Sequence, residues 1–99
     1  MTRISLIAVL ACAALPVQAQ DSPAARTLAA TCASCHGSEG RSVTKEVASL
    51  AGLPREHITS SMKAFRDGSR PATVMHQIAK GYSDQQIDLM ADYFSRRPR

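Results

Sequence analysis

The sequence predicts an all-α fold, in which three helices and one short segment pack around a single core. Two observations lead to this fold class. Apolar residues recur three and four positions apart, as in Ile58, Met62 and Phe65, which is the spacing of a buried helix face. No stretch alternates apolar and polar residues as a strand does. A chain of 99 residues has room for one small domain.

The beginning of the chain has the composition of a secretory leader. A short basic start precedes an apolar run over residues 4–15, and a small-residue cleavage site follows at residues 17–19. We predict a cleaved signal peptide over residues 1–19 and a mature domain over residues 20–99. The apolar run is too short to span a bilayer. Lipid attachment at Cys12 is the alternative, and it would leave a very short apolar region.

The first helix of the mature domain begins at Asp21-Ser22-Pro23, where a capping residue precedes a proline in the first helical position. It is expected to continue towards Cys32. Gly37 and Gly40 then end it and open a region over residues 37–53 that has no sustained periodicity. We therefore expect this region to be irregular.

The second helix begins at Pro54 and ends at Gly68. Its apolar stripe consists of Ile58, Met62 and Phe65. A short segment that begins at Arg70-Pro71 and ends near Gly81 follows it. The last helix has the fullest start signal, because Ser83 and Gln86 form a capping box. Its buried stripe consists of Ile87, Met90, Ala91 and Phe94.

The sequence Cys32-Ala33-Ser34-Cys35-His36 carries most of the chemical information. Two cysteines with this spacing and a histidine directly after them indicate covalent attachment of one c-type haem. Each thiol adds to one haem vinyl group, and His36 lies under the ring face as the proximal iron ligand. A redox pair without haem would need a βαβ context, and zinc would need further ligands at suitable spacing.

A second axial ligand is expected well downstream of this motif. Met62 and Met90 lie on amphipathic stripes, where a methionine is more often a core residue. Met75 lies in a segment too short for an ordinary core helix, which favours it as the ligand. His76 is the rival candidate, because imidazole also binds haem iron. His57 is expected to lie exposed or near the haem edge.

Several stretches resemble the cytochrome c subunit of flavocytochrome c sulfide dehydrogenase, a member of the class I cytochromes c. The resemblance covers the chain from Cys32 to Phe94, and Met75 to Tyr82 is the part that narrows the family. The matching stretches are Ala64 to Gly68, Ala72 to Asp84, Ile87 and Ala91 to Phe94. One departure is Ala48, at a position where relatives often carry a proline.

The resemblance implies a small class I cytochrome c fold with thioether links at Cys32 and Cys35, His36 as proximal ligand and Met75 as distal ligand. It implies a periplasmic one-electron carrier that is not an enzyme on its own. It also implies a flavoprotein partner that oxidises sulfide. The alternatives are a free shuttle that serves an oxidase or another dehydrogenase, a haem-based gas sensor, and a thiol oxidoreductase without haem.

The net charge of +4 is modest and offers few clues to partners. Two basic groups stand out, which are Lys63, Arg66 and Arg70 near the end of the second helix, and Arg96, Arg97 and Arg99 at the end of the chain. Each group alone is expected to be solvated surface, with a frayed terminus at the second. Taken together they would steer an acidic redox partner. The small excess of positive charge and the absence of a nucleic-acid recognition motif argue against nucleic-acid binding.

Overall fold

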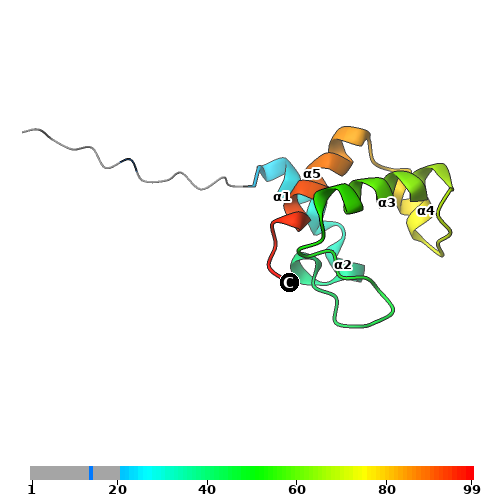
Figure 1. Cartoon of the computed structure of the whole chain (residues 1–99), viewed down its shortest axis with the longest axis horizontal. Helices are drawn as coiled ribbons and strands as arrows, with labels where there is room; N and C mark the ends of the chain where they lie inside the picture. Colours follow the sequence, from blue (N-terminus) through cyan, green and yellow to red (C-terminus); the bar gives the residue numbers. More distant parts are fainter. Residues whose placement is uncertain (1–13, 15–20) are drawn as a thin grey trace, which may run out of the picture.

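The computed structural model describes Ala14 and residues 21–99 of the chain. Apart from Ala14, the predicted signal peptide and Cys12 lie outside the described residues. The described part is helical and contains no strand, which confirms the all-α prediction (Figure 1). Its elements are α1 (Pro23–Ala30), α2 (Ala33–His36), a 3-10 turn η1 (Ser38–Gly40), α3 (Arg55–Asp67), α4 (Met75–Ala79) and α5 (Asp84–Ser95). None of these helices is long and apolar enough to cross a membrane.

Helix α1 starts as predicted but ends earlier. The Ser22 side chain accepts a hydrogen bond from the N–H of Ala25 at 3.1 Å, which confirms its capping role. The helix ends at Ala30, before Cys32, towards which it was expected to continue, and before Gly37, which was expected to end it. The backbone N–H of Thr31 bonds to the residue three positions back, and its hydroxyl donates to the same carbonyl of Leu28 at 2.7 Å. This tighter turn ends the helix, and α2 begins a new one after Cys32.

Helix α3 starts and ends within one residue of the prediction, and helix α5 starts where predicted. Helix α3 follows Pro54 and ends at Gly68, which adopts the left-handed conformation common after a helix. At the start of α5, the N–H of Gln86 donates to the Ser83 hydroxyl at 3.2 Å, and the N–H of Ser83 donates to the Gln86 amide oxygen at 2.9 Å. The predicted capping box is therefore confirmed.

The core lies where α1 and α3 pack against α5, with α4 packed on α3 (Figure 1). The predicted stripes supply it, since Ile87 and Phe94 of α5 are fully buried and Ile58 of α3 is 6% exposed. Met62 and Met90 are 9% and 3% exposed, as expected of core methionines. The buried cluster is Ala29, Ile58, Met62, Ala79, Ile87, Met90, Ala91 and Phe94.

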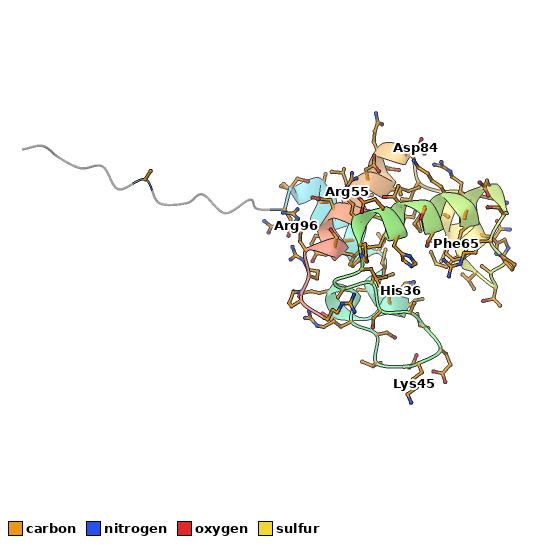
Figure 2. The ribbon with its side chains drawn as sticks, in the orientation of Figure 1. His36, Lys45, Arg55, Phe65, Asp84 and Arg96 are labelled. Atoms are coloured by element: carbon orange, nitrogen blue, oxygen red, sulfur yellow. The ribbon has the colours of Figure 1, made fainter. Side chains whose placement is uncertain are left out.

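The segment between α2 and α3 is a long loop that folds back on itself. The carbonyl of Gly40 accepts hydrogen bonds from the N–H groups of Leu50 at 2.7 Å and Ala51 at 3.2 Å, which closes the loop over residues 41–49. Figure 2 shows Lys45 at the outer end of this loop and His36 near its base. The prediction of an irregular region is confirmed except for the short turn η1. This closure brings residues near Ala48 back over α2.

The C-terminal arginines do not form a frayed basic tail. Asp21, before α1, pairs with both Arg96 and Arg97 at the end of α5. Arg97 also lies over the Tyr93 ring at 4.2 Å, and Arg99 donates to the carbonyl of Gly52 at 3.3 Å. The two ends of the described domain are thus joined through ion pairs. The charges of Arg96 and Arg97 are balanced by Asp21 within the chain, which weakens their predicted role in steering a partner.

Candidate functional site

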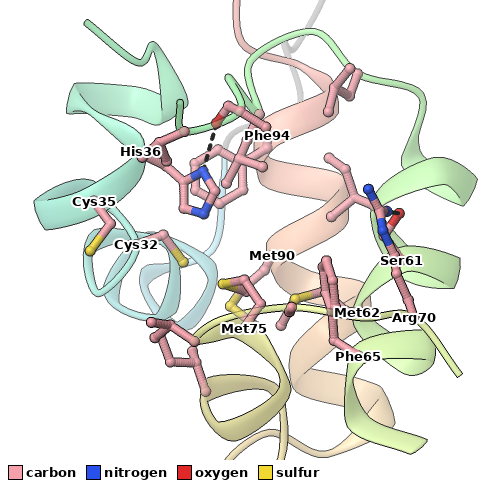
Figure 3. Close-up of a pocket in the computed structure, with 18 of the residues that line it drawn as sticks. Cys32, Cys35, His36, Ser61, Met62, Phe65, Arg70, Met75, Met90 and Phe94 are labelled. Atoms are coloured by element: carbon pink, nitrogen blue, oxygen red, sulfur yellow. Dashed lines mark hydrogen bonds between the residues drawn. The ribbon is translucent and has the colours of Figure 1, made fainter. Parts of the chain in front are cut away.

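A largely apolar cavity of about 450 Å³ lies between α2, the long loop, α3, α4 and α5 (Figure 3). This volume is in the usual range for sites that take a small molecule or cofactor. The predicted residues Cys32, Cys35, His36 and Met75 all line this cavity, although they come from two separate segments, the stretch at α2 and the start of α4. The fold therefore brings the sequence-predicted site together.

The orientation of His36 is set by the long loop. Its Nδ1 lies 2.6 Å from the carbonyl oxygen of Ala48, the bond that is dashed in Figure 3. Because a carbonyl can only accept, Nδ1 carries a proton, and in the neutral ring the lone pair is therefore on Nε2. A fixed tautomer with Nε2 available is what a metal-binding imidazole requires. Alanine at position 48 supplies this carbonyl.

The two cysteines lie at the rim of the cavity and are not joined by a disulfide, with Cys32 half-buried and Cys35 exposed. Burial raises the pKa of the Cys32 thiol; the hydrogen bond with the Thr31 hydroxyl partly offsets this, and the nearby Cys35 adds the smallest upward effect. Catalytic C-x-x-C pairs instead have a cysteine of lowered pKa. The electrostatics of Cys32 thus argue against the alternative of a thiol oxidoreductase without haem.

The opposite wall holds the candidates for the second axial ligand. Met75 is the first residue of α4 and lines the cavity, whereas the adjacent His76 is not among the lining residues. Figure 3 shows the side chains of Met62, Met75 and Met90 gathered on this side. Met62 and Met90 are held in the buried core, while Met75 is only half-buried. His57 is exposed at the cavity edge, as predicted.

This donor set fits a haem. Two thiols at one side can bond to vinyl groups, an imidazole nitrogen and a thioether sulfur can bind iron from two faces, and apolar walls can cover the ring. In the sequence, Ala48 stood out only as a departure from relatives near His36, Ser61 carried no signal, and Arg70 was placed among surface charges. Ser61 and Arg70 both line the cavity.

A family profile described as cytochrome c oxidase, cbb3-type, subunit III, matches residues 19–94. Curated relatives point to the same kind of protein. The cytochrome subunit of sulfide dehydrogenase from Chlorobaculum tepidum is 42% identical over 67 residues, which are 68% of this chain and 60% of the relative. Cytochrome c-554(548) from Halomonas halodenitrificans is 36% identical over 80 residues, which are 78% of this chain and 96% of the relative.

A third relative has a different named role. The thiosulfate dehydrogenase electron acceptor from Thiomonas intermedia is 36% identical over 69 residues, which are 69% of this chain but 32% of the relative. The chain thus spans less than two thirds of the sulfide dehydrogenase subunit and about a third of the thiosulfate dehydrogenase acceptor.

Proposed function

The chain belongs to this family of c-type cytochromes and carries covalently bound haem c, and from that premise we propose that it is a one-electron carrier. In this proposal Cys32 and Cys35 hold the haem by thioether links, and His36 and Met75 bind its iron. The observation that carries the assignment is the bond from His36 Nδ1 to the carbonyl of Ala48, which leaves Nε2 available to the apolar cavity.

When bound, the haem supplies an iron that alternates between ferric and ferrous states. Two residues of this chain would hold that iron. His36 is oriented by the closed loop, and Met75 would approach from the start of helix α4. A thioether opposite an imidazole raises the reduction potential relative to two imidazoles. With His36 and Met75 as its ligands, the iron would have no position left for a substrate, so the chain would carry electrons and would not be an enzyme on its own.

The partner we favour is a flavoprotein that oxidises sulfide, with the carrier located in the periplasm. This rests on the likeness to a sulfide dehydrogenase subunit and on the predicted signal peptide. A free shuttle is the second candidate, because a small cytochrome c-554(548) is matched over 96% of its length. The thiosulfate dehydrogenase acceptor offers a third electron source that can be tested in the same way.

The test uses native periplasmic extract separated by size and followed at haem and flavin wavelengths together. If the proposal is right, haem and flavin elute together at a mass well above one small domain. Addition of sulfide then reduces the haem in that fraction. Thiosulfate, added to a parallel sample, is the matched control and leaves the haem ferric.

Two results would contradict the sulfide assignment. Haem that elutes alone and is unaffected by sulfide favours the free shuttle. Haem that is reduced by thiosulfate and not by sulfide favours a thiosulfate dehydrogenase as the electron source. A colourless protein from a host competent in haem attachment would overturn the electron-carrier proposal itself.

A further inference from the structure

A hydrogen bond between two side chains joins distant segments at the edge of the cavity. The hydroxyls of Thr31 and Tyr82 lie 2.8 Å apart, although the two residues are 51 positions apart in the chain. Thr31 directly precedes the C-x-x-C-H motif, and Tyr82 follows α4, which begins with Met75. Within the described chain, no other hydrogen bond links residues 31–36 to α3, α4, α5 or the turns between them. The bond therefore connects the segment of the predicted thioether links to the segment of the predicted distal ligand.

Tyr82 is the donor in this bond. The Thr31 hydroxyl lies 2.7 Å from the carbonyl oxygen of Leu28, which can only accept. Because a hydroxyl has a single hydrogen, Thr31 donates to Leu28 and accepts from Tyr82. The two bonds form a short chain from the phenol to the last turn of α1, and bonds in such a chain strengthen one another. The Tyr82 side chain is half-buried and lines the cavity, so its ring is held in place at this wall.

Helix α4 and the turn after it are held together as one hydrogen-bonded unit. Where the helix begins, the carbonyl of Val74 accepts from the N–H of Ile78 at 3.2 Å. Where it ends, the N–H of Tyr82 donates to the carbonyl of Ala79 at 3.3 Å, and Ala79 is fully buried. A movement of the helix that withdraws Met75 from the cavity therefore moves Tyr82 as well.

Tyr82 is also anchored through its backbone. Its carbonyl accepts a hydrogen bond from Nη1 of Arg66 on α3 at 3.2 Å. The backbone of Tyr82 is thus joined to α3, and its side chain is joined to the residue that follows α1. Because α4 packs on α3, the Thr31 bond is the contact that adds the haem-attachment side to this arrangement.

We propose that Tyr82, through its hydroxyl bond to Thr31, is a positioning residue that keeps Met75 on the haem iron against outside ligands. The inference rests on the proposed function, in which Met75 is the distal ligand. An outside ligand can bind on that side only in molecules from which Met75 has withdrawn, so its apparent affinity depends on the fraction of such open molecules. The bond to Thr31 is present in the closed form and is lost when α4 moves away. It therefore lowers the open fraction.

The size of the effect follows from the strength of one hydrogen bond. A single intramolecular hydrogen bond shifts an equilibrium by about two- to tenfold. Thr31 is exposed, so water takes the place of the phenol when the bond opens, and the lower part of this range applies. Loss of the bond should therefore raise the open fraction, and with it the affinity for an outside ligand, by about two- to fivefold.

The experiment is a titration of haem-loaded ferric protein with imidazole, followed by absorbance. Tyr82→Phe keeps the ring and removes the hydroxyl, so imidazole should bind about two- to fivefold more tightly than to wild type. Tyr93→Phe is the matched control, because it makes the same change at a tyrosine outside the cavity lining. Thr31→Val, which removes the acceptor, should also raise the affinity. Thr31→Ser keeps the hydroxyl and should stay near wild type.

The double variant tests whether the two hydroxyls act through the same bond. Tyr82→Phe combined with Thr31→Val should raise the imidazole affinity by less than the product of the two single effects. The inference is overturned if the two effects multiply independently. It is also overturned if Tyr82→Phe binds imidazole no more tightly than Tyr93→Phe, because Met75 would then leave by rotation of its side chain alone.

Denaturant unfolding of the same variants separates positioning from a merely structural role. A loss of stability in Tyr82→Phe with unchanged imidazole affinity would refute the positioning role. If Tyr82→Phe does not take up haem, the comparison of Thr31→Val with Thr31→Ser decides the question. A different result would count against the proposed function itself, namely that Met75→Ala binds imidazole no more tightly than wild type, since Met75 would then not be the ligand.

Discussion

Replacement of Gly40 by alanine should lower the unfolding free energy of this protein by about 2–5 kcal/mol. Gly40 has a φ of +78°, and an added Cβ would lie 2.7 Å from Cδ1 of Phe94 and 3.1 Å from the N–H nitrogen of Ala51. The left-handed backbone costs an L-residue about 1–2 kcal/mol. Overpacking against a buried ring adds about 1–3 kcal/mol. The total is a large share of the 5–15 kcal/mol that stabilises a typical domain.

The site itself should also respond, because the Gly40 carbonyl closes the loop that carries Ala48 onto His36. The assay is denaturant unfolding of the haem-loaded ferric protein, followed by ellipticity and by haem absorbance. Gly68→Ala is the matched control. Gly68 has a φ of +82° but nothing within 4 Å of an added Cβ. It should therefore lose only the backbone part, about 1–2 kcal/mol.

The difference in unfolding free energy between Gly40→Ala and Gly68→Ala measures the cost of the contact with Phe94. Equal losses in Gly40→Ala and Gly68→Ala would refute the packing argument. Shortening the obstructing ring provides a second check, since Phe94→Leu combined with Gly40→Ala should cost less than the sum of the two single changes. Strict additivity of the pair would mean that the two side chains do not interact.

Three further outcomes are expected. Met75→Ala should keep covalent haem, lower the potential and allow imidazole to bind the iron, whereas spectra identical to wild type in both oxidation states would exclude Met75 as the ligand. The hydrogen bond and charge of Arg66 lower the pKa of Asp84. This stabilisation is present above the ordinary aspartate pKa of about 3.9 and disappears as pH falls through the lowered value, so the melting temperatures of wild type and Asp84→Asn should converge in acid. Cys32→Ser combined with Cys35→Ser should leave the chain largely unfolded by far-ultraviolet ellipticity, and a cooperative melting transition would contradict a haem-filled core.

Local signals account for most of the helix boundaries. Ser22, Ser83 and Gln86 cap helices through bonds to residues three positions away, so their roles can be inferred without knowledge of the fold. The end of α1 was mispredicted because the glycine signal lay further on, at Gly37. The helix has already ended at Thr31, where the backbone N–H bonds to the carbonyl of Leu28, three positions back. The sequence carries no strong marker for this tighter turn.

The sequence by itself determined the covalent haem motif, the all-α class and the buried stripes, because each depends on residue types at fixed short spacing. The tertiary structure decided which groups meet across the cavity. Loop closure at Gly40 brings the Ala48 carbonyl to His36, the fold of α4 sets Met75 rather than His76 on the cavity, and the chain reversal after α3 returns Arg70 to the cavity. Such contacts join residues far apart in the chain, and they form only when the core holds the helices and loops in place.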